Sequence, residues 1–259
     1  MLSTDEFNGV LENIKQHRHP AKNTLIVQLI FKLGFRAQEL SLLRIREVAN
    51  LGAEFPKGYQ LKDVLVLPKS FTKGAKPTGD TTYEKSPRTS VRFDIEDFNK
   101  LVGRIVRDTK KGIEILPSDY YPAIRKRGGK TRELPITDAD LIAALQGYLD
   151  ERLLSPIKLR PNDPLILSQK GGAYSPNTLQ GHISKMLRLW SGVDRASSHS
   201  GRRTLATKLL RDQGEPLAVV QELLGHKAPS TTAIYHHVSE EDVKQALHRV
   251  GKKYKGSPK

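Results

Sequence analysis

The sequence predicts an α+β fold that is mainly helical and includes a small antiparallel sheet. Apolar residues recur at helical spacing over most of the chain. Short β-like runs occur at residues 63–68, 90–93, 130–136 and 164–168. The 259 residues are also enough for one large domain with a sizeable core.

The N-terminal part is expected to be helical. Ser3 and Glu6 have the capping-box spacing that starts a first helix. A second helix has apolar residues at helical spacing up to residue 33, and Gly34 is expected to end it. Arg36 follows this glycine among apolar residues, and Glu39 lies three positions later. A lone arginine after a helix is usually a surface charge, but this setting predicts an arginine held at the core edge by a carboxylate.

The middle of the chain alternates strands and helices. Residues 74–90 are rich in Lys, Thr, Gly and Pro and are interpreted as a loop. The other elements expected here are a helix at 95–106, a strand at 130–136, a helix at 138–153, a short strand or extended piece at 164–168, and a helix at 177–190.

The last third is expected to be mostly helical. A helix covers 204–212, Pro216 lies in the first turn of the next helix, and Gly225 ends it. His226 would then lie just past a helix end. Ser230 or Thr231 is expected to cap a following helix that carries Tyr235, and a final amphipathic helix is expected over 239–250.

The charge balance indicates a polyanionic partner. Lys and Arg total 43 and Asp and Glu total 28, a formal charge of +15, which favours nucleic acid first and an anionic membrane second. The absence of Cys excludes disulfides, thiol nucleophiles and Cys-ligated zinc. No signal peptide or membrane-spanning run is found. We therefore expect a cytoplasmic protein with no membrane partner.

A few scattered residues have the chemistry to attack a phosphodiester. His199 and Arg202 form an H-x-x-R pair, His226 follows Leu-Gly, Tyr235 comes nine positions after it, and Arg36 lies far upstream. Arginine forks match phosphate oxygens and stabilise a transition state with extra negative charge. A phenol with a pKa near 10 needs such a cationic site to act as a nucleophile at neutral pH.

Each of these residues also has a structural interpretation when it is taken alone. His226 after a helix stop is often a cap, and Tyr235 is often a half-buried core aromatic. The joint pattern favours the catalytic interpretation. No His, Asp or Glu pattern specifies a metal site, so we expect neither a metal nor a cofactor.

These segments together resemble the catalytic domain of the tyrosine recombinases, the phage integrase family. The resemblance spans nearly the whole chain and is carried by five segments: Gly34-Phe35-Arg36 with Glu39-Leu40, Lys130-Thr131-Arg132 leading to Pro135, His199-Ser200-Gly201-Arg202-Arg203-Thr204, Leu224-Gly225-His226, and Thr232-Ala233-Ile234-Tyr235. It implies the tyrosine recombinase catalytic-domain fold, with a catalytic set of Arg36, Lys130, His199, Arg202, His226 and Tyr235.

The resemblance also implies an activity. A site-specific recombinase of this family cleaves and rejoins double-stranded DNA through a 3′-phosphotyrosyl intermediate, without metal or ATP. Integration, excision or inversion of a mobile element is the expected use, with self-association into a tetramer on DNA and a place on the prokaryotic nucleoid. The alternatives are a type IB-like topoisomerase, which relaxes DNA without strand exchange, and a DNA-binding protein that does not cut.

The proton donor for the leaving oxygen is a place where the sequence departs from the common pattern of the family. The family uses a lysine in a β-hairpin. Lys130 is the first choice here, Lys73 fits if residues 74–129 are an insertion that splits the hairpin, and Lys126 is third. Any of these lysines can instead be a solvated charge.

The domain prediction is a single catalytic domain over residues 1–250, with a basic flexible tail at 251–259 and no N-terminal core-binding domain. Residues 74–129 are either a module that contacts DNA or a partner, or a solvated excursion. The amphipathic helix at 239–250 either packs on its own core or docks on a neighbouring protomer.

Overall fold

The structure is a computed structural model that describes residues 2–68, 71, 76–78, 84–85, 95–114, 123–125, 131–155, 158–226, 228–235 and 244. Helices make up most of the described chain, and every strand pair in it is antiparallel. The predicted α+β, mainly helical fold class is therefore confirmed. Among the described residues, no helix is both long and apolar enough to cross a bilayer.

The two N-terminal helices contribute buried side chains to the core. α1 (Thr4–Lys15) starts with the predicted capping box, because Ser3 Oγ accepts the Glu6 N–H at 3.1 Å and the Glu6 carboxylate accepts the Ser3 N–H at 2.6 Å. α2 (Pro20–Leu33) ends at Gly34, whose φ of 65° is the left-handed geometry of a helix stop. Both predictions are confirmed.

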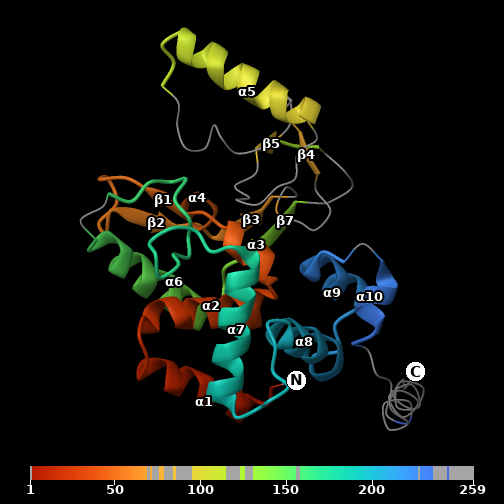
Figure 1. Ribbon diagram of the computed structural model, residues 1–259. Coiled ribbons are helices and arrows are strands. Elements are labelled where there is room, and N and C mark those ends of the chain that lie inside the picture. Colours follow the sequence, from red (N-terminus) through yellow and green to blue (C-terminus); the bar gives the residue numbers. More distant parts are fainter. Residues whose placement is uncertain are drawn as a thin grey trace, which may run out of the picture.

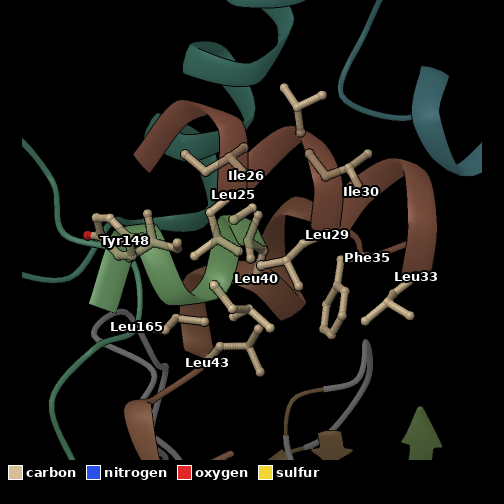
Figure 2. Packing of buried hydrophobic residues seen from close by; sticks show 14 of the residues in the cluster. Leu25, Ile26, Leu29, Ile30, Leu33, Phe35, Leu40, Leu43, Tyr148 and Leu165 are labelled. Carbon is tan, nitrogen blue, oxygen red and sulfur yellow. The ribbon is translucent and has the colours of Figure 1, made fainter. Parts of the chain in front are cut away.

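The core surrounds α2. Figure 2 shows leucines and isoleucines of α2 packed against Phe35, Leu40 and Leu43 of the next segment and against Tyr148 and Leu165. α3 (Ala37–Leu42) and α4 (Ile45–Val48) continue from α2, and α6 (Ala139–Leu153) and α8 (Ser200–Thr207) pack on it. α7 (Pro176–Ser191) packs on α1 and α3 (Figure 1). The buried apolar side chains thus hold the end of α2, where Arg36 lies, in a fixed position.

Three small sheets lie beside the helices. β1 (Ala49–Leu51) pairs with β2 (Tyr59–Leu61), and β3 (Val64–Leu67) pairs with β7 (Arg132–Pro135), with Leu67 opposite Arg132. β6 (Ala123–Arg125) lies between β4 (Lys76–Thr78) and β5 (Glu84–Lys85). Residues 68–131 therefore lie between the two strands of the β3–β7 pair.

The loop interpretation of residues 74–90 is wrong in part. β4 and β5 lie within this range, and both pair with β6 about forty residues later. Strands of two or three residues have too few positions for an alternating pattern. Pro77 is tolerated because β4 is an edge strand.

α5 (Ile95–Lys110) lies beyond the three-stranded sheet, at the end of the molecule drawn uppermost in Figure 1. It extends the helix expected at 95–106 by one turn. The strand at 130–136 and the helices at 138–153 and 177–190 are confirmed as β7, α6 and α7. Residues 164–168 make isolated bridges only, Arg44 with Pro164 and Leu167 with Ala173, so this piece is extended rather than a strand.

The last third differs from the prediction at the helix ends. α8 begins at Ser200 rather than Thr204, and its first turn includes Gly201, which packs so closely on α2 that an added Cβ would lie 2.5 Å from Ile30. A π-helical segment (Lys208–Asp212) follows α8, and α9 (Leu217–Leu224) ends at Gly225 as predicted. Pro216 is the residue before α9 rather than in its first turn.

The prediction for α10 (Pro229–Ala233) is wrong at both ends. Ala228 is its N-cap, Pro229 takes the first turn, and Ser230 and Thr231 lie inside the helix. Tyr235 lies two residues after the helix instead of on it. Of the helix expected at 239–250 only Lys244 is described, and it is helical, whereas the tail at 251–259 lies outside the described residues.

Candidate active site

Arg36 lies at the junction of α2 and α3 and is held by Glu39. The Arg36 backbone N–H donates to Glu39 Oε2 at 3.0 Å, and Arg36 Nη1 donates to Glu39 Oε1 at 2.7 Å. The side chain of Arg36 is 28% exposed, whereas that of Glu39 is 1% exposed. The predicted arginine at the core edge, oriented by a carboxylate, is present.

Arg132, the first residue of β7, binds the same Glu39 carboxylate. Its Nη2 donates to Glu39 Oε2 at 2.8 Å, and its Nη1 donates to the Leu223 carbonyl near the end of α9 at 2.8 Å. Arg132 is almost fully buried, and its Nε has no hydrogen-bond partner within the described part of the chain. One guanidinium thus ties β7 to both α3 and α9.

The electrostatics of this cluster keep Glu39 ionised. Burial alone would raise the pKa of Glu39, but the charges of Arg132 and Arg36 outweigh burial and hold that pKa below its usual value. Both oxygens of the buried Glu39 carboxylate accept hydrogen bonds from the arginines, and the carboxylate fixes the orientation of Arg36, the more exposed of the two.

Arg202 projects from the first turns of α8 into the same region. Its Nη1 donates to the Gly34 carbonyl at 2.6 Å, and its Nη2 donates to the Leu224 carbonyl. Burial, and then the neighbouring charge of Arg36, lower the pKa of Arg202 to about 9. The residue is only 3% exposed but remains a cation at neutral pH. It joins the end of α2 to the end of α9.

His199 lies one position before α8 and is exposed. Partial burial lowers the pKa of His199, and the charges of Arg202 and Arg36 lower it further. Both arginines act electrostatically on the imidazole. It is therefore neutral near pH 7 and able to accept a proton.

His226 directly follows Gly225, the glycine that ends α9. Gly225 has a φ of 63°, and His226 is 8% exposed, with its Nδ1 2.8 Å from Thr232 Oγ1. Burial, then Arg202 and Arg36, lower the pKa of His226 to about 4. The imidazole is therefore neutral at pH 7, and the Thr232 hydroxyl fixes the orientation of the ring.

Tyr235 lies against His226. The two ring centroids are 6.2 Å apart with planes inclined by 24°, and the Tyr235 N–H donates to the Thr232 carbonyl at 3.0 Å. The ring is half-buried beside a small apolar cluster formed by α8, the π-helical segment and α9, which includes Leu210 and Leu224. The phenol also acts electrostatically on Arg202.

The structure brings together five of the six residues named from the sequence: Arg36, His199, Arg202, His226 and Tyr235. The sixth, Lys130, lies outside the described residues, as do Lys73 and Lys126. No three His, Asp or Glu side chains of the described ranges gather closely enough to hold a metal ion.

Sequence reasoning missed Arg132 and Thr232 as parts of this site. Both lie in segments that carry the family resemblance, next to Lys130 and three residues before Tyr235. Their positions in those segments were a usable signal. Their partners, Glu39 and His226, were not visible as contacts until the chain was folded.

A match to a known protein family identifies the family of this chain. Residues 98–242, more than half of the chain, match the Phage integrase family. The chain belongs to this family. The matched residues include Arg132, His199, Arg202, His226 and Tyr235, whereas Arg36 lies before them.

Relatives in this family are tyrosine recombinases. The chain is 39% identical over 113 residues to tyrosine recombinase XerC of Methylobacterium sp. (strain 4-46), covering 43% of this chain and 33% of the relative. It is 35% identical over 140 residues to tyrosine recombinase XerD of Caulobacter vibrioides, covering 51% and 45%. The matched part therefore spans less than half the length of these relatives.

Solved structures agree on the fold. The XerA recombinase crystal structure has a TM-score of 0.56 at 20% identity, covering 96% of this chain and 64% of that one. The Tn1549 transposon integrase gives 0.59 at 16% identity, covering 96% and 65%. The likeness at these identities establishes the tyrosine recombinase fold of this phage integrase family member, as the sequence predicted.

Proposed function

We propose that this chain is the catalytic part of a site-specific recombinase that cleaves and rejoins double-stranded DNA through a covalent bond to Tyr235. Membership of the phage integrase family supports the proposal. The observation that carries it is a cluster in which Arg36 and Arg202 act electrostatically on neutral His199 and His226, with the Tyr235 ring beside His226. XerH and the Tn1549 integrase, which share the fold, were solved with DNA substrates.

The arginines bind the scissile phosphate. Arg36 is the more exposed of the two, so the phosphate meets it first, with Arg202 behind. A guanidinium has five N–H donors, and Arg202 uses two in its contacts to Gly34 and Leu224. The two cations neutralise the phosphodiester and stabilise the extra charge of the five-coordinate transition state.

Tyr235 is the nucleophile. Its oxygen attacks phosphorus, the bond to the 5′ oxygen breaks, and the strand is held as a 3′-phosphotyrosine with a free 5′ hydroxyl. Attack by a 5′ hydroxyl reverses the step, so rejoining needs no external energy. The phenol loses its proton during attack, and neutral His199 is the base that accepts it.

His226 and a lysine are the remaining proton donors of the reaction. When Nδ1 of neutral His226 accepts from the Thr232 hydroxyl, Nε2 carries a proton that it donates to a phosphate oxygen. The leaving 5′ oxygen takes a proton from Lys130, with Lys73 and Lys126 as the alternatives. Lys130 comes two residues before β7, and Lys73 six residues after β3, the strand paired with it.

The partners follow from this chemistry. The formal charge of +15 fits a DNA duplex as substrate. Strand exchange between two duplexes requires several protomers, and we propose a tetramer on DNA. Integration, excision or inversion of a mobile element is the corresponding use, and it places the protein in the cytoplasm on the nucleoid.

The test is trapping of the covalent adduct. The Tyr235→Phe chain is used to select bound duplexes from a random DNA library, and a selected duplex is then nicked near the cleavage position so that religation fails. We expect an adduct with the unmodified chain and none with Tyr235→Phe, which should still bind. Binding by the unmodified chain with no adduct on any nicked duplex would leave a non-cleaving DNA-binding protein. Relaxation of supercoils without strand exchange would indicate the topoisomerase.

The lysine assignment has its own test. A substrate with sulfur at the 5′ bridging position has a leaving group that needs no proton. Replacing the true proton donor by alanine should abolish cleavage of ordinary DNA and leave cleavage of the sulfur substrate nearly unchanged. Lys130→Ala should show this pattern. If Lys73→Ala or Lys126→Ala shows it instead, the assignment moves to that lysine.

A further inference from the structure

The helix α5 carries an apolar face that this chain leaves in solvent. Leu101 is buried, and α5 contacts β4, above which it lies in Figure 1. The other apolar side chains are far more exposed: Ile95 75%, Val102 40%, Val106 47%, and Ile113 just past the helix 53%. Exposed apolar side chains along the whole length of an otherwise polar, basic helix are typical of a surface that binds another molecule.

Gly103 lies in the middle of the same helix. Glycine is less favourable than alanine inside a helix, so an interior glycine usually has a packing reason. The described residues supply none, because nothing is found within 4 Å of the position where a Cβ would be. A glycine at an open helix surface lets a second backbone approach closely.

Two opposite charges of α5 lie at equal distances from this glycine. Glu96 lies seven residues before Gly103 and is 80% exposed, and Lys110 lies seven residues after it. Seven residues are close to two helical turns, so the glutamate, the glycine and the lysine lie along one side of the helix. The Lys100 ammonium, 3.2 Å from Glu96, lies within the same helix.

We propose that α5 binds α5 of a second copy of this chain in an antiparallel pair whose two-fold axis passes beside Gly103. In this arrangement Glu96 of each copy faces Lys110 of the other, and Val102 and Val106 of the two copies interdigitate. A parallel pair would instead place Glu96 against Glu96 and Lys110 against Lys110. The charge pattern therefore selects the antiparallel pairing and identifies the occupant of this face as an identical helix.

This interface is independent of the catalytic residues. The three-stranded sheet lies between α5 and the pair α9 and α10 (Figure 1). His226 lies between α9 and α10, and Tyr235 follows α10. The interface gives the segment between β3 and β7 the role of holding two copies together without DNA. Its tests need no cleavage measurement, so their failure leaves the recombinase proposal untouched.

The absence of cysteine from the chain permits a direct cross-linking test. Gly103→Cys in the full chain should form a disulfide-linked dimer on mild oxidation, because the two sulfurs lie across the two-fold axis. Gly181→Cys on α7 is the matched control, since it is also a helical glycine with nothing within 4 Å of its Cβ position. Cross-linking of Gly103→Cys no faster than that of Gly181→Cys overturns the proposal.

Charge reversal tests the direction of the pair. The unmodified chain should sediment as a dimer that dissociates on dilution. Glu96→Lys and Lys110→Glu should each weaken this dimer several-fold, as exposed pairs turned repulsive do. The double variant restores opposite charges and should dimerise as the unmodified chain does. A monomer at every concentration tested, or a double variant no tighter than the single ones, refutes the antiparallel pair.

Discussion

Arg132 Nη2 lies 2.8 Å from Glu39 Oε2, and both side chains are almost completely removed from solvent. The other oxygen of that carboxylate binds the half-exposed Arg36. Arg132 therefore provides the buried counter-charge that lets a carboxylate stay ionised inside the core, and that carboxylate directs the arginine facing solvent. Arg132 acts on the site through Glu39 and is a positioning residue.

Removing Arg132 should strongly destabilise the fold. Arg132→Met leaves the Glu39 carboxylate without its buried counter-charge, and breaking a buried pair in this way costs about 3–5 kcal/mol. Urea unfolding of the full chain measures the loss. Arg203→Met is the control, because Arg203 is exposed on α8 and its Nη2 contact to Ser197 is 3.3 Å long. A loss no larger than that of the control would contradict the buried role of Arg132.

Glu39 should contribute to the acid sensitivity of the protein. Its pKa is lower in the folded chain than in the unfolded chain, where it is about 4.3. Such a carboxylate stabilises the fold above its unfolded pKa, and this stabilisation is lost as the pH falls through the folded pKa. Glu39→Gln should be less stable than the unmodified chain at pH 7 but should lose less stability below about pH 4.

The measurement is the free energy of unfolding as a function of pH. Glu12→Gln is the control for removing a carboxylate, since Glu12 forms an exposed pair with Lys15 on α1. Parallel acid profiles for Glu39→Gln and the unmodified chain would show that Glu39 has no depressed pKa.

How much of the site the sequence predicts depends on the distance along the chain between partners. Arg36 and Glu39 are three residues apart at a helix start, so their pairing followed from local geometry. Arg132 is 93 positions from Glu39, and no local pattern indicates that contact. The strands β4 and β5 were missed for the same reason, because their pairing with β6 is non-local and they are only two or three residues long.

The fold itself was more predictable because its main helices are long and periodic. α2 is apolar and buried on nearly every side, α6 and α7 each bury a regular apolar face, and glycine or serine marks an end of α2 and of α7. α10 is only five residues long, so its ends are set by Pro229 and by the contacts of Thr232. That is why Tyr235 was expected on the helix and lies beyond it.

His226 should titrate far below an ordinary histidine. Burial and the nearby arginines lower its pKa to about 4. The folded chain therefore resists protonation of this ring while the unfolded chain binds a proton near pH 6.5, so the fold loses stability as the pH falls from about 6.5 towards 4. NMR titration of the His226 ring, assigned with His226→Gln, should give a midpoint near the lower value. A midpoint near 6.5 would contradict the buried, cation-flanked setting.

Arg36 should matter for rate more than for stability. It is the more exposed arginine of the site, and loss of one preorganised donor costs about 10²–10³ in rate. Arg36→Ala should therefore slow formation of the Tyr235 adduct by that factor on a nicked duplex. Arg203→Ala removes an equal charge next to Arg202 and is the control. Equal slowing by both variants would mean that only the net charge of the site matters.

The glycine that ends α9 should be irreplaceable because of Arg132. Gly225 and Gly192 both end helices with left-handed geometry, with φ of 63° and 71°, so alanine costs about 1–2 kcal/mol in backbone strain at either position. At Gly192 a Cβ meets nothing within 4 Å, whereas at Gly225 it would lie 2.7 Å from Arg132 Cδ.

Arg132 cannot move away, because Glu39 and the Leu223 carbonyl hold its guanidinium. Gly225→Ala should therefore lose about 1–3 kcal/mol more than Gly192→Ala in urea unfolding, the usual cost of overpacking. It should also displace His226, which follows directly, and so slow adduct formation, while Gly192→Ala keeps the normal rate. Equal losses of stability at the two positions would mean that the Gly225 segment yields and that Arg132 does not fix it.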